Sequence, residues 1–184
     1  MKVESLSIAD VKLITPKKFG DGRGFFSETW NEQALAAAGI AAHFVQDNHA
    51  HSGAKGTVRG LHFQTGPMAQ DKLIRVTRGA ILDVAVDLRR SSTTFGKHVA
   101  AVLSAANWSQ LWVPKGFAHG YCTLEPDTEV MYKVSAYYSP THDRGILWDD
   151  PALAIAWPVT SATVHLSDKD KLQPKLASLP PVFD

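Results

Sequence analysis

The sequence has few of the features that assign a protein to a class at first sight. It has one cysteine, Cys122, which excludes an internal disulfide and favours a reducing compartment. No apolar run approaches the roughly 20 residues that span a bilayer. The segment after Met1 also lacks the basic and apolar stretches of a signal peptide. We therefore expect a cytoplasmic protein with no membrane partner.

An excess of charge of either sign is also missing. The formal net charge is +1 at pH 7, which argues against nucleic acid or an anionic membrane surface as a partner. No repeat, low-complexity tract or linker divides the 184 residues. We expect one domain over residues 1–184, in which any bound anion is held by a local cluster of basic side chains.

What the chain does contain is a series of short β-strand patterns. From Leu82 to Leu88, apolar residues alternate with Asp83, Ala85 and Asp87, which is the period of a strand. Further strands are predicted over residues 73–79, 99–103, 110–113 and 130–136, separated by Gly, Pro, Ser and Asn turns. Many short strands favour an all-β sandwich or barrel.

Two short helices interrupt this pattern. One is predicted from Glu32 to Ala38, with Asn31 as its N-cap and Gly39 as its end. A second begins in the segment 167–170, and Pro174 and the later prolines keep it short.

Two segments, 58–64 and 112–120, each deliver one histidine from a glycine-flanked stretch. The run from Pro114 to His119 has the Pro-x-Gly-x-x-His form that resembles the second cupin motif. The first cupin motif adds a His-x-His pair and a Glu, but here the matching stretch is His62-Phe63-Gln64 and no Glu follows before Gly79. A catalytic metal normally needs three protein ligands. We therefore predict no metal.

These residues instead indicate acid–base chemistry. A histidine has an ordinary pKa near 6.5, which suits proton removal at neutral pH. A carbanion beside a carbonyl needs a cation to stabilise its oxyanion, and Lys72 is the natural candidate. Tyr132 or Tyr138 could return a proton from the opposite face, and an acidic partner would orient His62.

Six segments together resemble the dTDP-4-dehydrorhamnose 3,5-epimerase family. They are residues 21–28, 44–48, 56–64, 113–121, 131–133 and 137–150, in this order along the chain. The resemblance implies a mainly β fold, a cupin-type double-stranded β-helix or jelly-roll barrel with a few short helices. It also implies a homodimer in which a neighbouring subunit completes part of the site.

The resemblance implies a catalytic role for four residues. His62 would be the general base, Tyr132 the general acid, and Lys72 the group that stabilises the enolate oxygen. Asp170 would be the partner of His62, with Asp168 close enough in sequence to be the alternative.

The resemblance also implies which residues bind the substrate, a dTDP-4-keto-6-deoxy sugar nucleotide. Tyr138 would stack on the thymine ring, and arginines suit the diphosphate because a guanidinium binds its oxygens in a bidentate fashion. The full implied set is Arg23, Phe26, Glu28, Gln46, Asp47, Asn48, Arg59, Lys72, His119, Tyr138, Asp143 and Lys169.

The implied reaction inverts C3 and C5 of dTDP-4-dehydro-6-deoxy-D-glucose and needs no cofactor, because the C4 ketone itself delocalises the carbanion. Two alternatives remain open. Relatives with a similar pocket invert only C3 or only C5, and a non-catalytic cupin could bind the sugar nucleotide without reacting. Since His62, Lys72 and Tyr132 are all present, the sequence favours the double epimerase.

Overall fold

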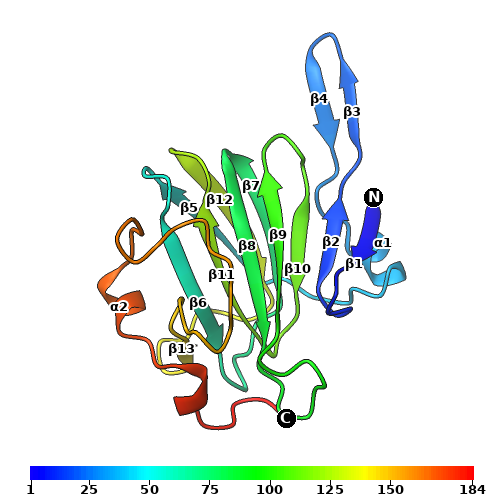
Figure 1. The fold of residues 1–184 in the computed structure, drawn as a ribbon. Helices are drawn as coiled ribbons and strands as arrows, with labels where there is room; N and C mark the ends of the chain where they lie inside the picture. The colour runs from blue at the N-terminus through cyan, green and yellow to red at the C-terminus, as the bar shows by residue number, and fades with distance from the viewer.

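The computed structural model describes residues 1–184 as two antiparallel sheets that face each other across a barrel interior (Figure 1). The six-stranded sheet has the order β1 (Lys2–Ser5), β2 (Lys12–Thr15), β10 (Gln110–Val113), β7 (Lys72–Arg78), β12 (Thr128–Val134), β5 (Gln46–Ser52). The five-stranded sheet has the order β13 (Asp143–Gly145), β6 (Val58–Gln64), β11 (Phe117–Thr123), β8 (Ala80–Asp87), β9 (His98–Ser104). The predicted mainly β, cupin-type jelly-roll barrel is confirmed.

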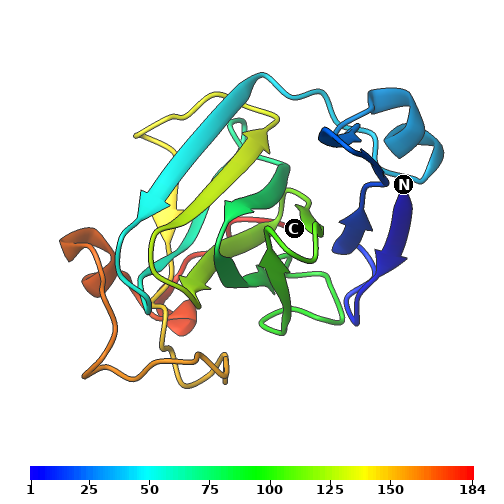
Figure 2. The same ribbon diagram turned by 90° about the horizontal axis from the view of Figure 1, so that it is seen from above.

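The helices are short, as the sequence predicts. Helix α1 (Glu32–Ala37) begins where the Asn31 side chain accepts a hydrogen bond from the Ala34 amide. Helix α2 (Asp168–Lys171) begins in the same way at Ser167, and a 3-10 turn, η1 (Leu176–Ser178), follows it. Figure 2 shows α1 beside the N-terminal strands on one side of the barrel and the C-terminal segment with α2 on the other. None of these helices is long and apolar enough to cross a membrane.

A hairpin that the sequence patterns did not predict projects from the barrel. It consists of β3 (Lys18–Asp21) and β4 (Gly24–Ser27), which pair only with each other (Figure 1). Its side chains Phe19, Phe25 and Phe26 are 53%, 56% and 69% exposed. Phe25 packs edge-on against Trp108 and Lys17 lies over the Phe19 ring, whereas the Phe26 ring has no aromatic or cationic partner in this chain. The arm therefore presents an apolar surface that its own chain covers only in part.

The acidic side chains of strand β8 point towards the barrel interior. Val84 and Val86 pack outward against the C-terminal segment, in a cluster that includes Leu176. The alternate positions, Asp83 and Ala85, point inward and are fully buried. Because both faces of this strand are covered, its apolar and acidic alternation does not separate a buried face from a solvated one.

Two glycines let β6 and β11 approach closely beside the two histidines. His62 on β6 and His119 on β11 are register partners, and the register shifts just beyond them. A Cβ on Gly60, whose φ is +131°, would lie 2.6 Å from the Gly120 Cα. A Cβ on Gly120 would lie 2.7 Å from the Arg59 carbonyl oxygen. No side chain fits at either position, so the glycines fix how both histidines enter the barrel.

Gly120→Ala should therefore separate β6 from β11 and destabilise the fold by about 1–3 kcal/mol, the usual range for overpacking. Urea unfolding measures this change in the free energy of unfolding. Gly22→Ala is the matched control, because no atom lies within 4 Å of its Cβ position. Equal stability of the two variants would contradict the close approach.

Candidate active site

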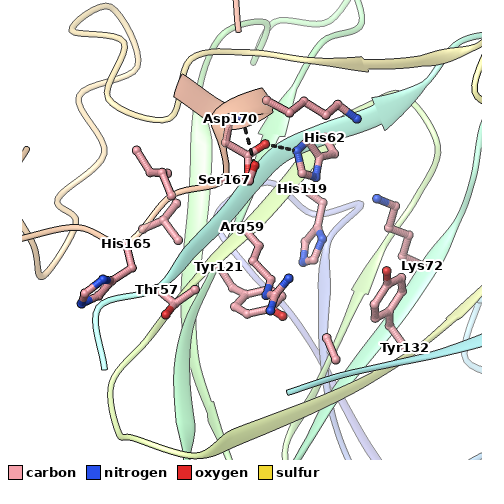
Figure 3. Close-up of a pocket in the computed structure, with 14 residues that line it drawn as sticks. Thr57, Arg59, His62, Lys72, His119, Tyr121, Tyr132, His165, Ser167 and Asp170 are labelled. Carbon is pink, nitrogen blue, oxygen red and sulfur yellow. Dashed lines mark hydrogen bonds and ion pairs between the residues drawn. The ribbon is translucent and has the colours of Figure 1, made fainter. Parts of the chain in front are cut away.

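A polar cavity of about 510 Å³ opens between the two sheets (Figure 3). An adjoining chamber of about 370 Å³ extends it towards β13 and the mouth of the barrel. His62, Lys72, Tyr132 and Lys169 line both chambers, so the two form one continuous site. The structure thus brings the predicted base, acid and cation to the same cavity.

His62 is held by a carboxylate from the C-terminal segment. Its Nε2–H donates to the Asp170 Oδ1 at 2.5 Å, while Ser167 caps the helix that carries Asp170. The sequence left two aspartates as possible partners of His62. Asp170 makes this contact, whereas Asp168 is exposed and pairs with Lys171. With Nε2 occupied, Nδ1 is the ring nitrogen left to accept a proton.

Burial alone would raise the pKa of Asp170, but its hydrogen bond and charge interaction with His62 lower the pKa below its usual value. Asp170 therefore stays ionised at neutral pH. An ionised carboxylate beside an imidazole stabilises its protonated form, which is the form that a general base takes once it has accepted a proton.

Lys72 and Tyr132 approach from the opposite sheet. Figure 3 shows them across the cavity from His62 and Asp170. Lys72 is 8% exposed, and burial lowers its pKa to about 8, although the charges of Asp143 and Asp83 oppose this shift. Burial also raises the pKa of the Tyr132 phenol; Arg59 counteracts this and Asp143 reinforces it. At neutral pH, Tyr132 thus carries a proton that it can donate, and most of Lys72 is charged.

His119 has its own carboxylate partner, which the sequence analysis missed. Its Nε2–H donates to the Asp83 Oδ1 at 2.6 Å, deep in the barrel. Asp83 is visible in the sequence as one of the acidic residues in the alternation over 82–88. Periodicity alone could not assign it to the inner face of the strand. No group of three or more His, Cys, Asp or Glu side chains converges so that it could hold a metal ion.

Arg59 supplies a cation on the wall of the cavity. Its Nε donates to the Ser52 Oγ at 3.1 Å and one Nη donates to the His51 carbonyl at 2.9 Å. These contacts leave the other guanidinium N–H groups free for an anionic ligand. Tyr121, which the sequence analysis also missed, lines the same wall, and its buried hydroxyl has no hydrogen-bond partner.

The second chamber gathers four more of the residues that the resemblance implied. They are Gln46, Asn48, Tyr138 and Asp143. Gln46 donates to Asn48 and accepts from the Tyr138 amide, while the Tyr138 hydroxyl donates to Asp143 at 3.2 Å. Lys169 also pairs with Asp143. The Tyr138 ring stays exposed at the mouth, where it can stack on a planar ligand.

Gln64 is a further residue that the implied set omitted. It is buried, and its Oε1 accepts from the Ser139 amide at 2.7 Å while its Nε2 donates to the Met68 and Tyr137 carbonyls. It therefore fixes the loop that carries Tyr138.

Four of the implied binding residues lie away from this cavity. Asp47 points to the outer face of β5 and pairs there with Lys133. Arg23 and Phe26 lie on the projecting hairpin, and Glu28 follows it. Within one chain the structure does not bring these side chains to the site.

Asp170→Asn should destabilise the protein at pH 7 by about 1.5–3 kcal/mol, the usual value of a hydrogen bond to a charged group. Because the folded-state pKa of Asp170 is lowered, its contribution is fully present above its unfolded value near 3.9 and is lost as the pH falls through the folded value. Urea unfolding of both proteins from pH 7 to below pH 4 should therefore give converging free energies.

Asp168→Asn is the control for this measurement, since its carboxylate is exposed and should leave the unfolding midpoint nearly unchanged. Parallel curves for the wild-type protein and Asp170→Asn down to pH 3 would contradict the assignment.

Comparison with known proteins identifies the family. The family model for dTDP-4-dehydrorhamnose 3,5-epimerase matches residues 5–178. A dTDP-4-dehydrorhamnose 3,5-epimerase of Sinorhizobium fredii is 56% identical over 183 residues, which are 100% of this chain and 93% of that protein.

Two crystal structures are similar over nearly the whole fold. The dTDP-4-dehydrorhamnose 3,5-epimerase of Bacillus anthracis, with TDP and PPi bound, gives a TM-score of 0.91 at 56% identity and covers 95% of this chain and 98% of that chain. A 3,5-epimerase of Legionella pneumophila in complex with dTDP-4-keto-L-rhamnose gives a TM-score of 0.92 at 42% identity, covering 97% and 94%. This chain therefore belongs to the dTDP-4-dehydrorhamnose 3,5-epimerase family.

Proposed function

We propose that this enzyme inverts both C3 and C5 of dTDP-4-dehydro-6-deoxy-D-glucose and so forms dTDP-4-dehydro-L-rhamnose. The observation that carries the proposal is the placement of His62 on the five-stranded sheet and of Tyr132 on the six-stranded sheet, across one cavity. Inversion of a carbon acid requires removal of a proton from one face and its return to the other. A base and an acid on opposite walls meet that requirement.

The reaction needs only the substrate's ketone and the side chains of the cavity. The C4 carbonyl acidifies the C–H bonds at C3 and C5. His62 takes a proton at Nδ1, the C–H electrons move into the C4 oxygen as an enolate, and Lys72 stabilises that oxygen. Tyr132 then gives its proton to the carbon from the opposite face. His62 passes its proton to solvent and the tyrosinate regains one, so no cofactor or metal is consumed.

The nucleotide would extend from this centre to the mouth of the barrel. Arg59 has free guanidinium N–H groups for the diphosphate, and the exposed Tyr138 ring can stack on the thymine. Gln46, Asn48 and His119 would hold polar groups of the ligand. Asp143 and Lys169 neutralise each other in the structure, so they shape the mouth as a pair.

A second copy of the chain would complete the site. The hairpin presents Arg23 and Phe26 on an arm that its own chain covers only in part, with Glu28 beside it. A C2 dimer places the same arm of each subunit against the other subunit. Arg23 could then reach the partner's diphosphate site and Phe26 the partner's thymine. We place the dimer in the cytoplasm, which suits a chain whose single thiol, Cys122, is buried and free.

Tyr132→Phe should separate proton exchange from inversion. His62 can still remove a proton and return one to the same face, but no acid stands on the other face. In D₂O, ¹H NMR should show deuterium entering C3 and C5 while inversion slows by about 10²–10⁴-fold, the usual contribution of a general acid. Tyr137→Phe is the control, because that side chain is exposed and does not line the cavity.

The other outcomes discriminate the alternatives. Exchange and inversion at one carbon in the unaltered enzyme would indicate a mono-epimerase. Binding of the ligand with exchange at neither carbon would contradict the enzyme and leave a binding protein. His62→Ala should abolish exchange at both carbons, and persisting exchange would identify a different base.

Mixing two inactive variants tests whether the arm crosses between subunits. His62→Ala removes the base, whereas Arg23→Ala removes the guanidinium that the arm would bring to the partner's site. In a mixed dimer, one site combines an intact barrel with an intact partner arm. Refolding an equal mixture should restore activity at roughly a quarter of the sites, because half of the dimers are mixed and each carries one complete site. No recovery in a confirmed mixed dimer would place Arg23 in its own subunit's site or outside catalysis.

A further inference from the structure

Asp83 is a buried carboxylate that the proposed reaction does not use directly. It lies on β8 behind His119, is 0% exposed, and does not line the cavity. Its Oδ1 accepts from His119 at 2.6 Å, whereas its Oδ2 has no hydrogen-bond partner. An ionised carboxylate with one unpaired oxygen in the interior is unfavourable unless a nearby positive charge compensates for it.

We propose that Asp83 is a positioning residue of this site, which orients His119 and supplies the negative charge that keeps Lys72 protonated. The proposal rests on the function proposed above, in which Lys72 stabilises the enolate oxygen. Only a protonated lysine can do so, because the neutral amine brings no positive charge to the oxyanion.

Charged and titratable groups surround Lys72 from both sheets and from helix α2. From the six-stranded sheet it faces Tyr132, and Tyr138 lines the same chamber. From the five-stranded sheet and helix α2 it faces Arg59, His62, His119, Tyr121, Lys169 and Asp170. The negative charges that favour its protonation are those of Asp143 at the mouth and Asp83 behind His119. Asp170 is already paired with His62.

The two favourable carboxylates differ in their availability. Asp143 accepts from Lys169 and from the Tyr138 hydroxyl, and it lines the chamber that the nucleotide would enter. A ligand can therefore alter its contacts. Asp83 lies beneath His119, where no ligand reaches it. It is the carboxylate whose effect on Lys72 persists throughout the catalytic cycle.

The pKa of Lys72 measures how strongly the neighbouring carboxylates favour its protonated form. Burial lowers the pKa of Lys72, and the two carboxylates limit the fall to about 8. Buried lysines without such partners reach a pKa of about 5–6. A lysine with that pKa would be almost entirely neutral at pH 7 and could not serve as the oxyanion's cation.

The decisive variant is Asp83→Asn, which keeps the shape and removes the charge. With less negative charge nearby, Lys72 should lose its proton at lower pH. The alkaline limit of kcat/KM should therefore move to lower pH by about one unit or more. Asp87→Asn is the matched control: Asp87 is equally buried on the same face of β8, but its partners are Arg89, Ser92 and Thr94, away from the cavity. It should lower stability without shifting the pH profile.

A second measurement reads Lys72 without turnover. NMR titration of ¹³C-labelled lysines, with Lys72 assigned from the Lys72→Arg variant, should give a pKa near 8 in the unaltered enzyme and a lower one in Asp83→Asn. An unchanged Lys72 titration in folded Asp83→Asn overturns the proposal even if the enzyme is active. A shifted titration supports it even if the proposed reaction fails.

If Asp83→Asn does not fold, Asp143→Asn answers the same question. Asp83 is then the remaining carboxylate that favours protonated Lys72. A Lys72 pKa that stays above about 6 supports the proposal, and a fall to the range of about 5–6 overturns it.

Discussion

The opposition of the two sheets across the barrel interior is the constraint on which the site depends. His62 and His119 enter from neighbouring strands of the five-stranded sheet, and Lys72 and Tyr132 enter from the six-stranded sheet. Because side chains alternate along a strand, a slip of one residue would turn any of these groups out of the barrel. The close approach at Gly60 fixes the register beside both histidines. The same backbone geometry thus determines packing and places His62 and Tyr132 on opposite walls of the cavity, as the proposed reaction requires.

The two histidines of the site are each paired with a carboxylate, and the two pairs differ in how deeply they are buried. His62 is paired with Asp170 at the wall formed by α2, and His119 is paired with Asp83 behind the cavity. Lys72 has no hydrogen-bonding partner of its own, which leaves its ammonium group available for the substrate oxygen. Burial of such a group is unfavourable, and the neighbouring carboxylates offset part of that cost. A water-poor cavity with fixed charges stabilises an enolate more strongly than solvent does.

The strand patterns of the sequence predicted several central strands of the two sheets, including strand β10, all four residues of which are buried. Strand β10 has the predicted bounds, and α1 ends one residue before the predicted Ala38. The hairpin escaped prediction because its rings are exposed, so its sequence shows no alternation between buried and solvated faces. Asp83 escaped because both faces of β8 are buried. Residues on separate segments, such as Asp170 and His62, could be joined only through the family resemblance, since spacing carries no information about contacts 108 residues apart.

The central claim is that the 4-keto sugar lies between the two sheets with its C4 oxygen on Lys72. A crystal structure of the His62→Asn variant with dTDP-4-dehydro-6-deoxy-D-glucose tests it most directly, because that variant should bind the substrate without converting it. We expect the C4 oxygen within hydrogen-bonding distance of the Lys72 Nζ, position 62 facing one side of the ring and the Tyr132 hydroxyl facing the other. A sugar bound with C4 away from Lys72, or with position 62 and Tyr132 on the same side of the ring, would contradict the account.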